Sequence, residues 1–181
     1  LLAGENKGEL HKTYQMIYRN AQRILRMINQ LMDIRKLDKG QMFMKFQETD
    51  MIGFITDVMQ PFEYMAHKKN IDFAFIHDMP QLKAWVDLNN FDKVLLKVLS
   101  NAFKYTPKKG VIRISVRQIN SNLQIKVYNT GKGICQESIP LIFNRYIVLD
   151  NIKENSIKGL SSRNGLRLAI CQSMVKLLQG E

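Results

Sequence analysis

One helical stretch carries polar and aromatic side chains in a pattern that suits a nucleotide ligand. Lys97, Asn101, Lys104 and Tyr105 stand at positions i, i+4, i+7 and i+8, so a helix over residues 91–105 places them side by side. The asparagine oxygen could hold a metal ion, the ammonium groups could hold phosphates, and the ring could stack on a base. A solvated helix face has the same composition, so this row alone leaves both interpretations open.

Two further stretches offer backbone groups to an anionic ligand. Residues 129–134 read Asn-Thr-Gly-Lys-Gly-Ile directly after a predicted strand, and Gly131 and Gly133 let the backbone approach a ligand closely. A turn also explains this spacing well. Residues 161–168 open a predicted final helix, whose free amide groups suit an anion.

The elements that position these residues follow from hydrophobic periodicity, and the first is a long helix. Apolar side chains recur at alternating steps of four and three, which is a heptad seam. It predicts a helix of roughly 28 residues between Gly8 and Gly40 and favours helix-bundle packing over packing on its own domain. The seam consists of Leu10, Tyr14, Ile17, Ala21, Ile24, Ile28 and Leu31.

After Gly40 the pattern alternates between strand and helix. Strands are expected at residues 42–50, 71–77 and 83–87, with Asp-Met-Pro as the turn between the last two. Asp50 is placed to cap a helix over residues 51–68. The apolar stripe of that helix consists of Ile55, Val58, Met59, Phe62, Met65 and Ala66.

The second half continues in the same way and predicts one α+β domain behind a leading helix. A helix ends at Thr106-Pro107 and buries Phe91, Val94, Leu95, Val98, Leu99 and Ala102. Residues 111–119 and 123–129 form a hairpin, residues 150–163 form a loop, and the last helix spans about 165–178.

Composition excludes several classes of protein. Lysine and arginine number 27 against 16 acidic residues, a net charge of +11 that favours an anionic partner. The basic residues are scattered and no nucleic-acid-binding motif accompanies them, so nucleic-acid binding is not expected. Cys135 and Cys171 lack the spacing of a disulfide framework or a zinc site, which suits a reducing cytoplasm. The most apolar stretch, residues 94–103, is too short to cross a bilayer.

The order and spacing of four segments resemble the N, G1, F and G2 boxes of the sensor histidine kinase catalytic domain. These segments are VLSNAFKYTP, YNTGKGI, IPLIFNRY and NGLRLAICQSMVKLLQG. The first helix resembles the second helix of the family's dimerisation and phosphotransfer hairpin. The amino-acid sequence as a whole is similar to those of the hybrid two-component sensors of gut Bacteroides. The resemblance implies a two-layer α/β sandwich of the Bergerat type behind a coiled-coil-like helix. Residues 1–40 would be the hairpin helix, and residues 41–181 the ATP-binding catalytic domain without its C-terminal strands.

The resemblance also implies a role for each box. Asn101 matches the magnesium-binding asparagine, Lys104 the phosphate-contacting lysine, and Tyr105 the aromatic residue of the adenine pocket. Residues 147–164 would form the ATP lid. The other matched positions are Asn129, Gly131, Gly133 and Ile134 in the first glycine box, Phe143, Arg145 and Tyr146 in the F box, and Gly165, Leu166, Arg167 and Leu168 in the second glycine box.

Four positions depart from the family pattern. Asn129 replaces an aspartate that accepts a hydrogen bond from the adenine amino group, and losing that charge would cost on the order of 1 to 3 kcal/mol. Arg163 and Arg167 replace glycines, and Lys97 replaces an asparagine found in many members. Two functions are therefore expected as alternatives: a kinase domain that binds ATP with Mg²⁺, or a degenerate pseudokinase domain that acts as a dimeric scaffold.

The resemblance places the phosphorylated histidine before Leu1, because none of the three histidines stands in an acceptor context. His11 is expected on a solvated helix face, and His67 and His77 are expected to be structural and without partners. The expected partners are a second copy through the first helix and a response-regulator receiver domain. The chain would be the cytoplasmic portion of an inner-membrane sensor, with membrane contact only through other segments.

Overall fold

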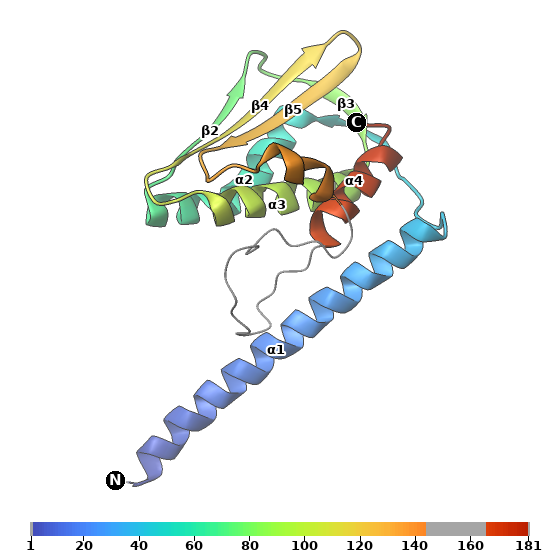
Figure 1. Ribbon diagram of the computed structural model, residues 1–181. Helices are drawn as coiled ribbons and strands as arrows, with labels where there is room; N and C mark the ends of the chain where they lie inside the picture. Colours follow the sequence, from blue (N-terminus) through green and yellow to red (C-terminus); the bar gives the residue numbers. More distant parts are fainter. Residues whose placement is uncertain (1, 144–165, 181) are drawn as a thin grey trace. The chain divides into compact units, whose positions relative to one another are not determined.

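The structure is a computed structural model that describes residues 2–143 and 166–180 (Figure 1). The described residues form two compact units, with the boundary between Met42 and Phe43. The first unit contains one helix, and the second contains five strands and the other described helices. Each unit is described by itself below.

Helix α1 spans Leu2–Asp38 and is longer than predicted, because it runs through Gly8. A glycine inside a helix costs about 1 kcal/mol relative to alanine, which does not end a helix on its own. Gly40 does follow the helix end, with φ of +61° and a hydrogen bond of 3.1 Å from its amide to the carbonyl of Leu37.

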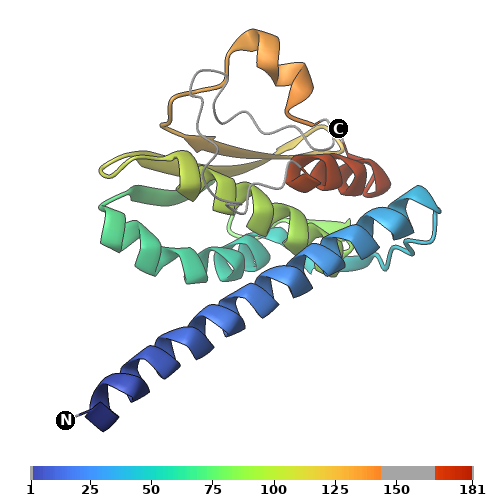
Figure 2. The ribbon, with the colours of Figure 1, turned by 60° about the horizontal axis from the view of Figure 1, so that its bottom comes forward.

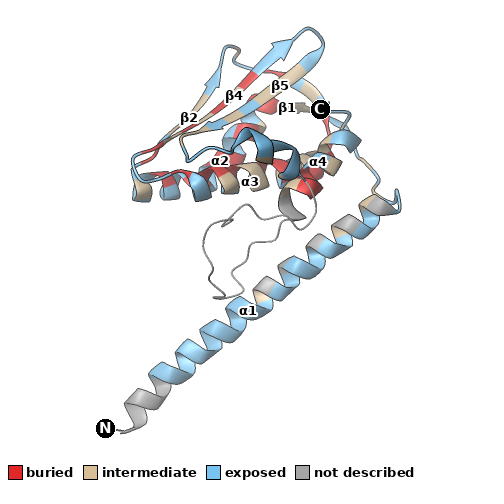
Figure 3. Cartoon of the chain, viewed as in Figure 1, coloured by how far each residue is buried: buried red, intermediate tan, exposed pale blue. Residues whose placement is uncertain are grey.

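The heptad seam of α1 is exposed along its length (Figure 3). Its large side chains are exposed between 50% at Ile28 and 63% at Tyr14. Because a regular apolar seam of this kind is stable when it is covered by another helix, the exposure is consistent with the bundle packing that the heptads predict.

The second unit contains two small sheets. Strand β1 (Gln47–Asp50) pairs antiparallel with β3 (Lys83–Val86). The other sheet has the order β2-β4-β5, in which β2 (Asp72–His77) runs parallel to β4 (Val111–Ile119), and β4 forms a hairpin with β5 (Asn122–Asn129). Asn120, with φ of +54°, lies in the hairpin turn as predicted.

One expectation about the strands is corrected. Residues 42–46 are not in a strand, since only the last four residues of the predicted segment pair with β3. Strands β2 and β3 lie where they were expected but do not pair with each other. The chain leaves β2, forms β3 in the other sheet, and returns through a helix to β4, which is the crossover that parallel strands require.

Helices α2 (Met51–Lys69) and α3 (Leu88–Tyr105) cover one face of the three-stranded sheet, and α4 (Leu166–Leu177) packs beside α3 (Figures 1 and 2). A short 3₁₀ helix spans Gln136–Leu141. The positions of α2, the hairpin and the final helix agree with the predictions to within one or two residues, and α3 begins three residues earlier than predicted. This arrangement is the predicted α+β architecture of two layers.

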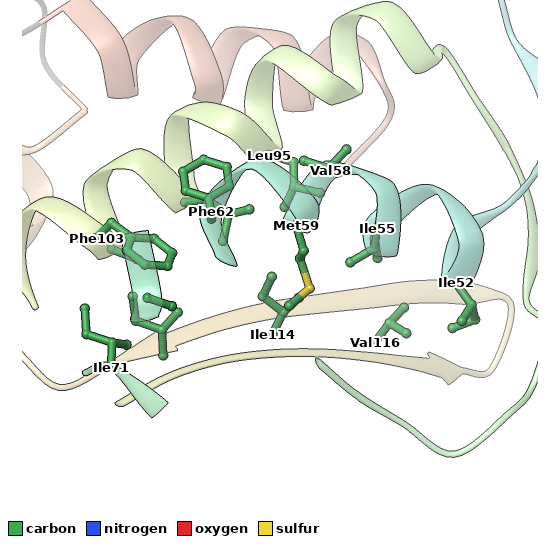
Figure 4. Packing of buried hydrophobic residues seen from close by; sticks show 14 of the residues in the cluster. Ile52, Ile55, Val58, Met59, Phe62, Ile71, Leu95, Phe103, Ile114 and Val116 are labelled. Atoms are coloured by element: carbon green, nitrogen blue, oxygen red, sulfur yellow. The ribbon is translucent and has the colours of Figure 1, made fainter. Parts of the chain in front are cut away.

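The apolar stripes of α2 and α3 meet the sheet in one core (Figure 4). Phe62 of α2 stacks on Phe103 of α3 with ring centroids 5.2 Å apart, and the ring of Phe73 in β2 meets Phe103 edge-on at 5.0 Å. The predicted stripe of α2 is buried except at Met65, which is 40% exposed. Helical spacing places Met65 at the edge of the stripe.

Two aspartates cap the helices of this core. Asp50 caps α2 as predicted, because its carboxylate accepts hydrogen bonds from the amides of Ile52 and Gly53. The sequence patterns did not indicate the second cap, Asp87, which is only 3% exposed. Asp87 accepts from the amides of Asn90 at 3.0 Å and Lys45 at 2.8 Å, so it ties the segment before β1 to the start of α3.

The ionisation of Asp87 should make stability depend on pH. Burial raises the pKa of this carboxyl, but hydrogen bonds from Lys45, Asn90 and Asn89 outweigh burial and hold the pKa below its usual value. A carboxyl with a depressed pKa stabilises the fold above its unfolded pKa of about 3.9, and the effect is lost as the pH falls through the folded pKa. We expect Asp87→Asn to unfold at a lower urea concentration than the wild type at neutral pH. Its free energy of unfolding should be lower by about 1 to 3 kcal/mol.

The difference between the two proteins should shrink in urea titrations as the pH falls through the folded pKa of Asp87, because both side chains are then neutral. Asp57→Asn, at an exposed position of α2, is the matched control. Its free energy of unfolding should depend on pH in the same way as that of the wild type. A difference that stays constant over this range would show that the charge of Asp87 does not contribute.

Candidate functional site

The C-terminal end of α3 carries three of the predicted site residues. Asn101 is half-buried, whereas Lys104 and Tyr105 are exposed. The Nζ atom of Lys104 donates a hydrogen bond of 2.7 Å to the hydroxyl of Tyr105 and lies 4.4 Å from the centre of its ring. The lysine and the aromatic ring therefore form one unit at the end of the helix.

The segment after β5 lies against this end of α3. A Cβ atom added at Gly131 would stand 2.9 Å from the carbonyl oxygen of Tyr105 and 3.2 Å from Nδ2 of Asn129. These contacts are too close for a side chain, so the glycine allows the two segments to touch. The structure thus brings Tyr105, Asn129 and Gly131 together, as their positions in the N and G1 boxes imply.

Thr130 fixes the position of that segment. Its amide donates a hydrogen bond of 2.9 Å to the carbonyl of Val111, and its Oγ1 accepts one of 2.7 Å from the amide of Val111. Gly133 has φ of +70°, a conformation that favours glycine, and a Cβ added there would meet nothing within 4 Å. The first glycine box therefore has one end pinned to β4 and an open turn beyond it.

A buried contact between the end of α3 and the start of β4 lies next to the site. Thr106, 3% exposed, donates its hydroxyl to the carbonyl of Ala102 at 2.7 Å and ends α3. A Cβ at Gly110 would stand 2.8 Å from Oγ1 of Thr130 and 3.0 Å from the carbonyl oxygen of Pro107, and it would also collide with the methyl group of Thr106. We call Thr106, Gly110 and Thr130 the α3–β4 junction. Sequence reasoning missed it, although Gly110 lies only three residues after the predicted helix stop at Thr106-Pro107.

Lys97 belongs to a different environment from the other members of its row. Its Nζ atom is buried. Burial raises the pKa of the Cys171 thiol in α4, and the charge of Lys97 acts against that shift. Lys97 therefore lies at the contact between α3 and α4. It is not part of the exposed unit that Lys104 and Tyr105 form.

The remaining predicted site residues are described only in part. Ile134 is 49% exposed and Phe143 is 36% exposed. Leu166 begins α4, Arg167 follows in its first turn, and Leu168 is half-buried. The predicted positions that lie outside the described residues are Arg145, Tyr146, Arg163, Gly165 and the lid segment 147–164.

Cys135, between the G1 box and the 3₁₀ helix, is exposed. Its Sγ lies 2.8 Å from Oγ of Ser138, and hydrogen bonds from that serine lower the pKa of the thiol. Its neighbour in sequence, Ile134, is a predicted site residue, so this thiol lies beside the candidate site in the chain.

The histidines have mostly structural surroundings. His11 lies on an exposed face of α1, 2.8 Å from Nε2 of Gln15, as expected of a solvated helix residue. His77 was expected to lack a partner, but its Nδ1 lies 2.8 Å from the carbonyl of Met79. His67 lies within α2 rather than beside a strand. In residues 2–143 and 166–180, no cluster of three or more histidine, cysteine or acidic side chains could hold a metal ion.

The residues at the end of α3 fit a magnesium nucleotide. Asn101 supplies the kind of oxygen ligand that Mg²⁺ accepts, and Lys104 supplies a cation for phosphates. The close packing of Gly131 on Tyr105 leaves backbone rather than side chain at the edge of the site. None of the helices in the described part of the chain is long and apolar enough to cross a membrane.

Comparisons with known proteins identify relatives of this chain. Residues 86–181, which contain α3, the hairpin and α4, match the family of histidine kinase-, DNA gyrase B- and HSP90-like ATPases. The chain is 32% identical over 171 residues to the sensor histidine kinase TmoS of Ectopseudomonas mendocina, which corresponds to 93% of this chain and 17% of that protein. It is 28% identical over 186 residues to hybrid signal transduction histidine kinase D of Dictyostelium discoideum, 99% of this chain and 12% of that protein.

Solved structures show the same fold. The nucleotide-free catalytic domain of the histidine kinase ThkA is 27% identical, with a TM-score of 0.64 over 75% of this chain and 82% of that one. ThkA in complex with the response regulator protein TrrA gives a TM-score of 0.64 over 87% of this chain and 43% of that chain, at 21% identity. The chain spans only 12% to 17% of the length of the two curated relatives named above.

Proposed function

Because the chain belongs to the family of histidine kinase-, DNA gyrase B- and HSP90-like ATPases and is the catalytic domain of a sensor histidine kinase, we propose that it transfers the γ-phosphate of ATP to a histidine outside residues 1–181. The observation that carries the proposal is the contact of Gly131 with the carbonyl of Tyr105. It joins the N-box helix to the first glycine box, and these segments lie far apart in the sequence.

The proposed roles of the site residues follow the chemistry of their side chains. Asn101 would hold Mg²⁺ through its amide oxygen, and Lys104 would bind phosphate. Tyr105 and Asn129 would line the adenine pocket. When bound, Mg²⁺ would neutralise part of the triphosphate charge. The backbone-contact positions are Gly131, Gly133, Ile134, Gly165, Leu166, Arg167 and Leu168, and Tyr146 of the F box would complete the pocket.

Catalysis in this proposal rests on positioning, because phosphoryl transfer needs little covalent chemistry from the protein. The pinned segment at Thr130 holds Asn129 in a fixed place beside Tyr105. Lys104 must leave the ring of Tyr105 when a base stacks there, and its ammonium then becomes available to the phosphates. The α3–β4 junction keeps these parts in register.

The larger assembly is proposed from α1 and from the relatives. Residues 1–40 would form the second helix of a dimerisation hairpin, with residues 41–181 as the ATP-binding domain. The exposed seam of α1 supports a homodimer whose helices form a four-helix bundle. A response-regulator receiver domain would accept the phosphoryl group, as the ThkA complex with TrrA suggests, and the hybrid relative supports a hybrid sensor. The Bacteroides type and the anchor in the inner membrane are proposed from the sequence resemblance alone.

A degenerate pseudokinase is the second candidate. Two observations favour it. The ammonium of Lys104 lies over the ring of Tyr105, where a base would stack. Lys97 replaces an asparagine of the family and lies at the contact with α4. With the uncharged Asn129 as well, the site would bind nucleotide weakly. The domain would then act as a dimeric scaffold.

Isothermal titration of Mg-ATP into the chain separates the two candidates. We expect saturable binding, which Asn101→Ala removes, and an affinity about tenfold higher for Asn129→Asp, because the carboxylate provides a charge-assisted hydrogen bond. Asn122→Asp, at the exposed opposite end of β5, is the matched control and should not change the affinity. Binding that appears only in the double variant Asn129→Asp with Arg167→Gly would contradict the kinase proposal and support the pseudokinase.

A further inference from the structure

A groove between α2 and β2 is not explained by nucleotide binding. Its cavity has a volume of about 440 Å³, within the size range of ligand sites. The side of the groove formed by α2 includes Thr56, Glu63 and His67, and the side formed by β2 includes Phe73, Ala74 and Phe75. None of the residues assigned to the nucleotide site lines it.

The backbone of β2 has free hydrogen-bonding groups along this groove. In the described part of the chain, β2 is an edge strand, because it pairs only with β4. The amide of Asp72 donates a hydrogen bond of 2.9 Å to Gly110, on the β4 side. Since successive residues of a strand direct their amide and carbonyl groups to opposite sides, Phe73 and Phe75 direct theirs to the open edge. These two residues also line the cavity.

The strand lacks two of the features that often close an edge. Its sequence, DFAFIH, contains neither lysine nor proline, the residues that natural edge strands use against unwanted pairing. An edge strand beside a helix is a geometry that binds extended peptides by adding a strand to the sheet. The six residues of β2 span roughly 20 Å, enough for a peptide of similar length.

The groove lining combines apolar side chains with polar ones, and it has one acidic position. Phe73 and Phe75 supply aromatic rings, and Phe75 lies against His77 with ring centroids 4.9 Å apart. Glu63 is the one acidic side chain among the lining residues, and it is exposed on α2. A ligand that buries apolar side chains here gains from a cation opposite Glu63.

We propose that this groove binds an extended peptide segment of a partner protein, with apolar side chains facing the groove and a lysine or arginine opposite Glu63. The peptide adds a strand to β2 through the backbone groups of Phe73 and Phe75. The site is separate from the nucleotide site, so its test does not depend on ATP binding.

The probe is a labelled peptide of sequence Thr-Val-Thr-Lys-Thr-Val with blocked ends, titrated into the 181-residue chain by fluorescence anisotropy. We expect saturable binding and amide shifts at Phe73 and Phe75 in NMR spectra. Glu63→Lys should weaken binding about three- to tenfold, the range for loss and reversal of an exposed ion pair. Asp57→Lys, an equivalent exposed change on α2 outside the groove, should not weaken it. A peptide with glutamate in place of lysine should bind Glu63→Lys better than wild type.

Four results would overturn the proposal. One is the absence of saturable binding at millimolar peptide, and another is an equal effect of the two α2 variants. Shifts of the groove side chains without shifts of the Phe73 and Phe75 amides would indicate a side-chain pocket rather than an added strand. Concentration-dependent changes at β2 without peptide would assign the edge to a second copy of the chain.

Discussion

Gly131→Ala is expected to reduce the affinity for Mg-ATP by at least about tenfold. Its Cβ would stand 2.9 Å from the carbonyl oxygen of Tyr105, which belongs to the last turn of α3 and cannot retreat without unwinding it. The other side cannot yield freely either, because Thr130 is bonded to Val111. Relieving an overlap of this kind costs about 1 to 3 kcal/mol, and moving the segment outward separates Asn129 from Tyr105. Titration calorimetry measures the loss.

The control is Gly8→Ala, because a Cβ at Gly8 meets nothing within 4 Å and the residue lies in α1. It should leave nucleotide affinity unchanged while making the helix slightly more stable. If Gly131→Ala bound Mg-ATP as well as the wild type, the contact between the two boxes would have no part in the site.

Gly110→Ala should have the largest effect on stability, a decrease of about 3 kcal/mol in the free energy of unfolding. The added Cβ would meet Thr106, Pro107 and Thr130 together. The two threonines cannot rotate away without losing their hydrogen bonds to Ala102 and Val111. Urea titration at neutral pH measures the decrease.

A second substitution tests the cause of that decrease. Thr106→Ser removes the methyl group that the new Cβ would strike but keeps the hydroxyl that donates to Ala102. In the Gly110→Ala background it should restore part of the lost stability. No recovery would show that Pro107 and Thr130 dominate the collision.

The elements of the second unit were predictable because their apolar periods are local properties of the sequence. The burial of Leu99 and Ile55 follows directly from helical spacing, and Asp50 stands where a cap is expected. The pairing of β2 with β4 was not predictable in this way, since it joins strands separated by β3 and α3. Helix α1 is longer than the heptad seam predicts, because Gly8 does not interrupt it.

The sequence predicts which residues belong to the candidate site, but it does not predict how they are arranged in space. Spacing indicated that Asn101, Lys104 and Tyr105 share a helix face, and the resemblance implied that the glycine box belongs with them. The close contact of Gly131 with Tyr105 depends on the end of β5 reaching the end of α3, which no local pattern encodes. For the same reason, the sequence placed Lys97 in the same row, although its ammonium is buried in the structure.

The hydrogen bond between the Lys45 amide and Asp87 limits the reach of the proposed kinase domain. It anchors the chain at the start of α3, so only residues 39–44 remain between the end of α1 and the anchored domain. A tether of that length extends at most roughly 20 Å. Within such a radius, ATP held by the domain has an effective concentration in the millimolar range with respect to groups near the end of α1. The short connection would thus make phosphoryl transfer within an assembled kinase far more frequent than transfer between separate molecules.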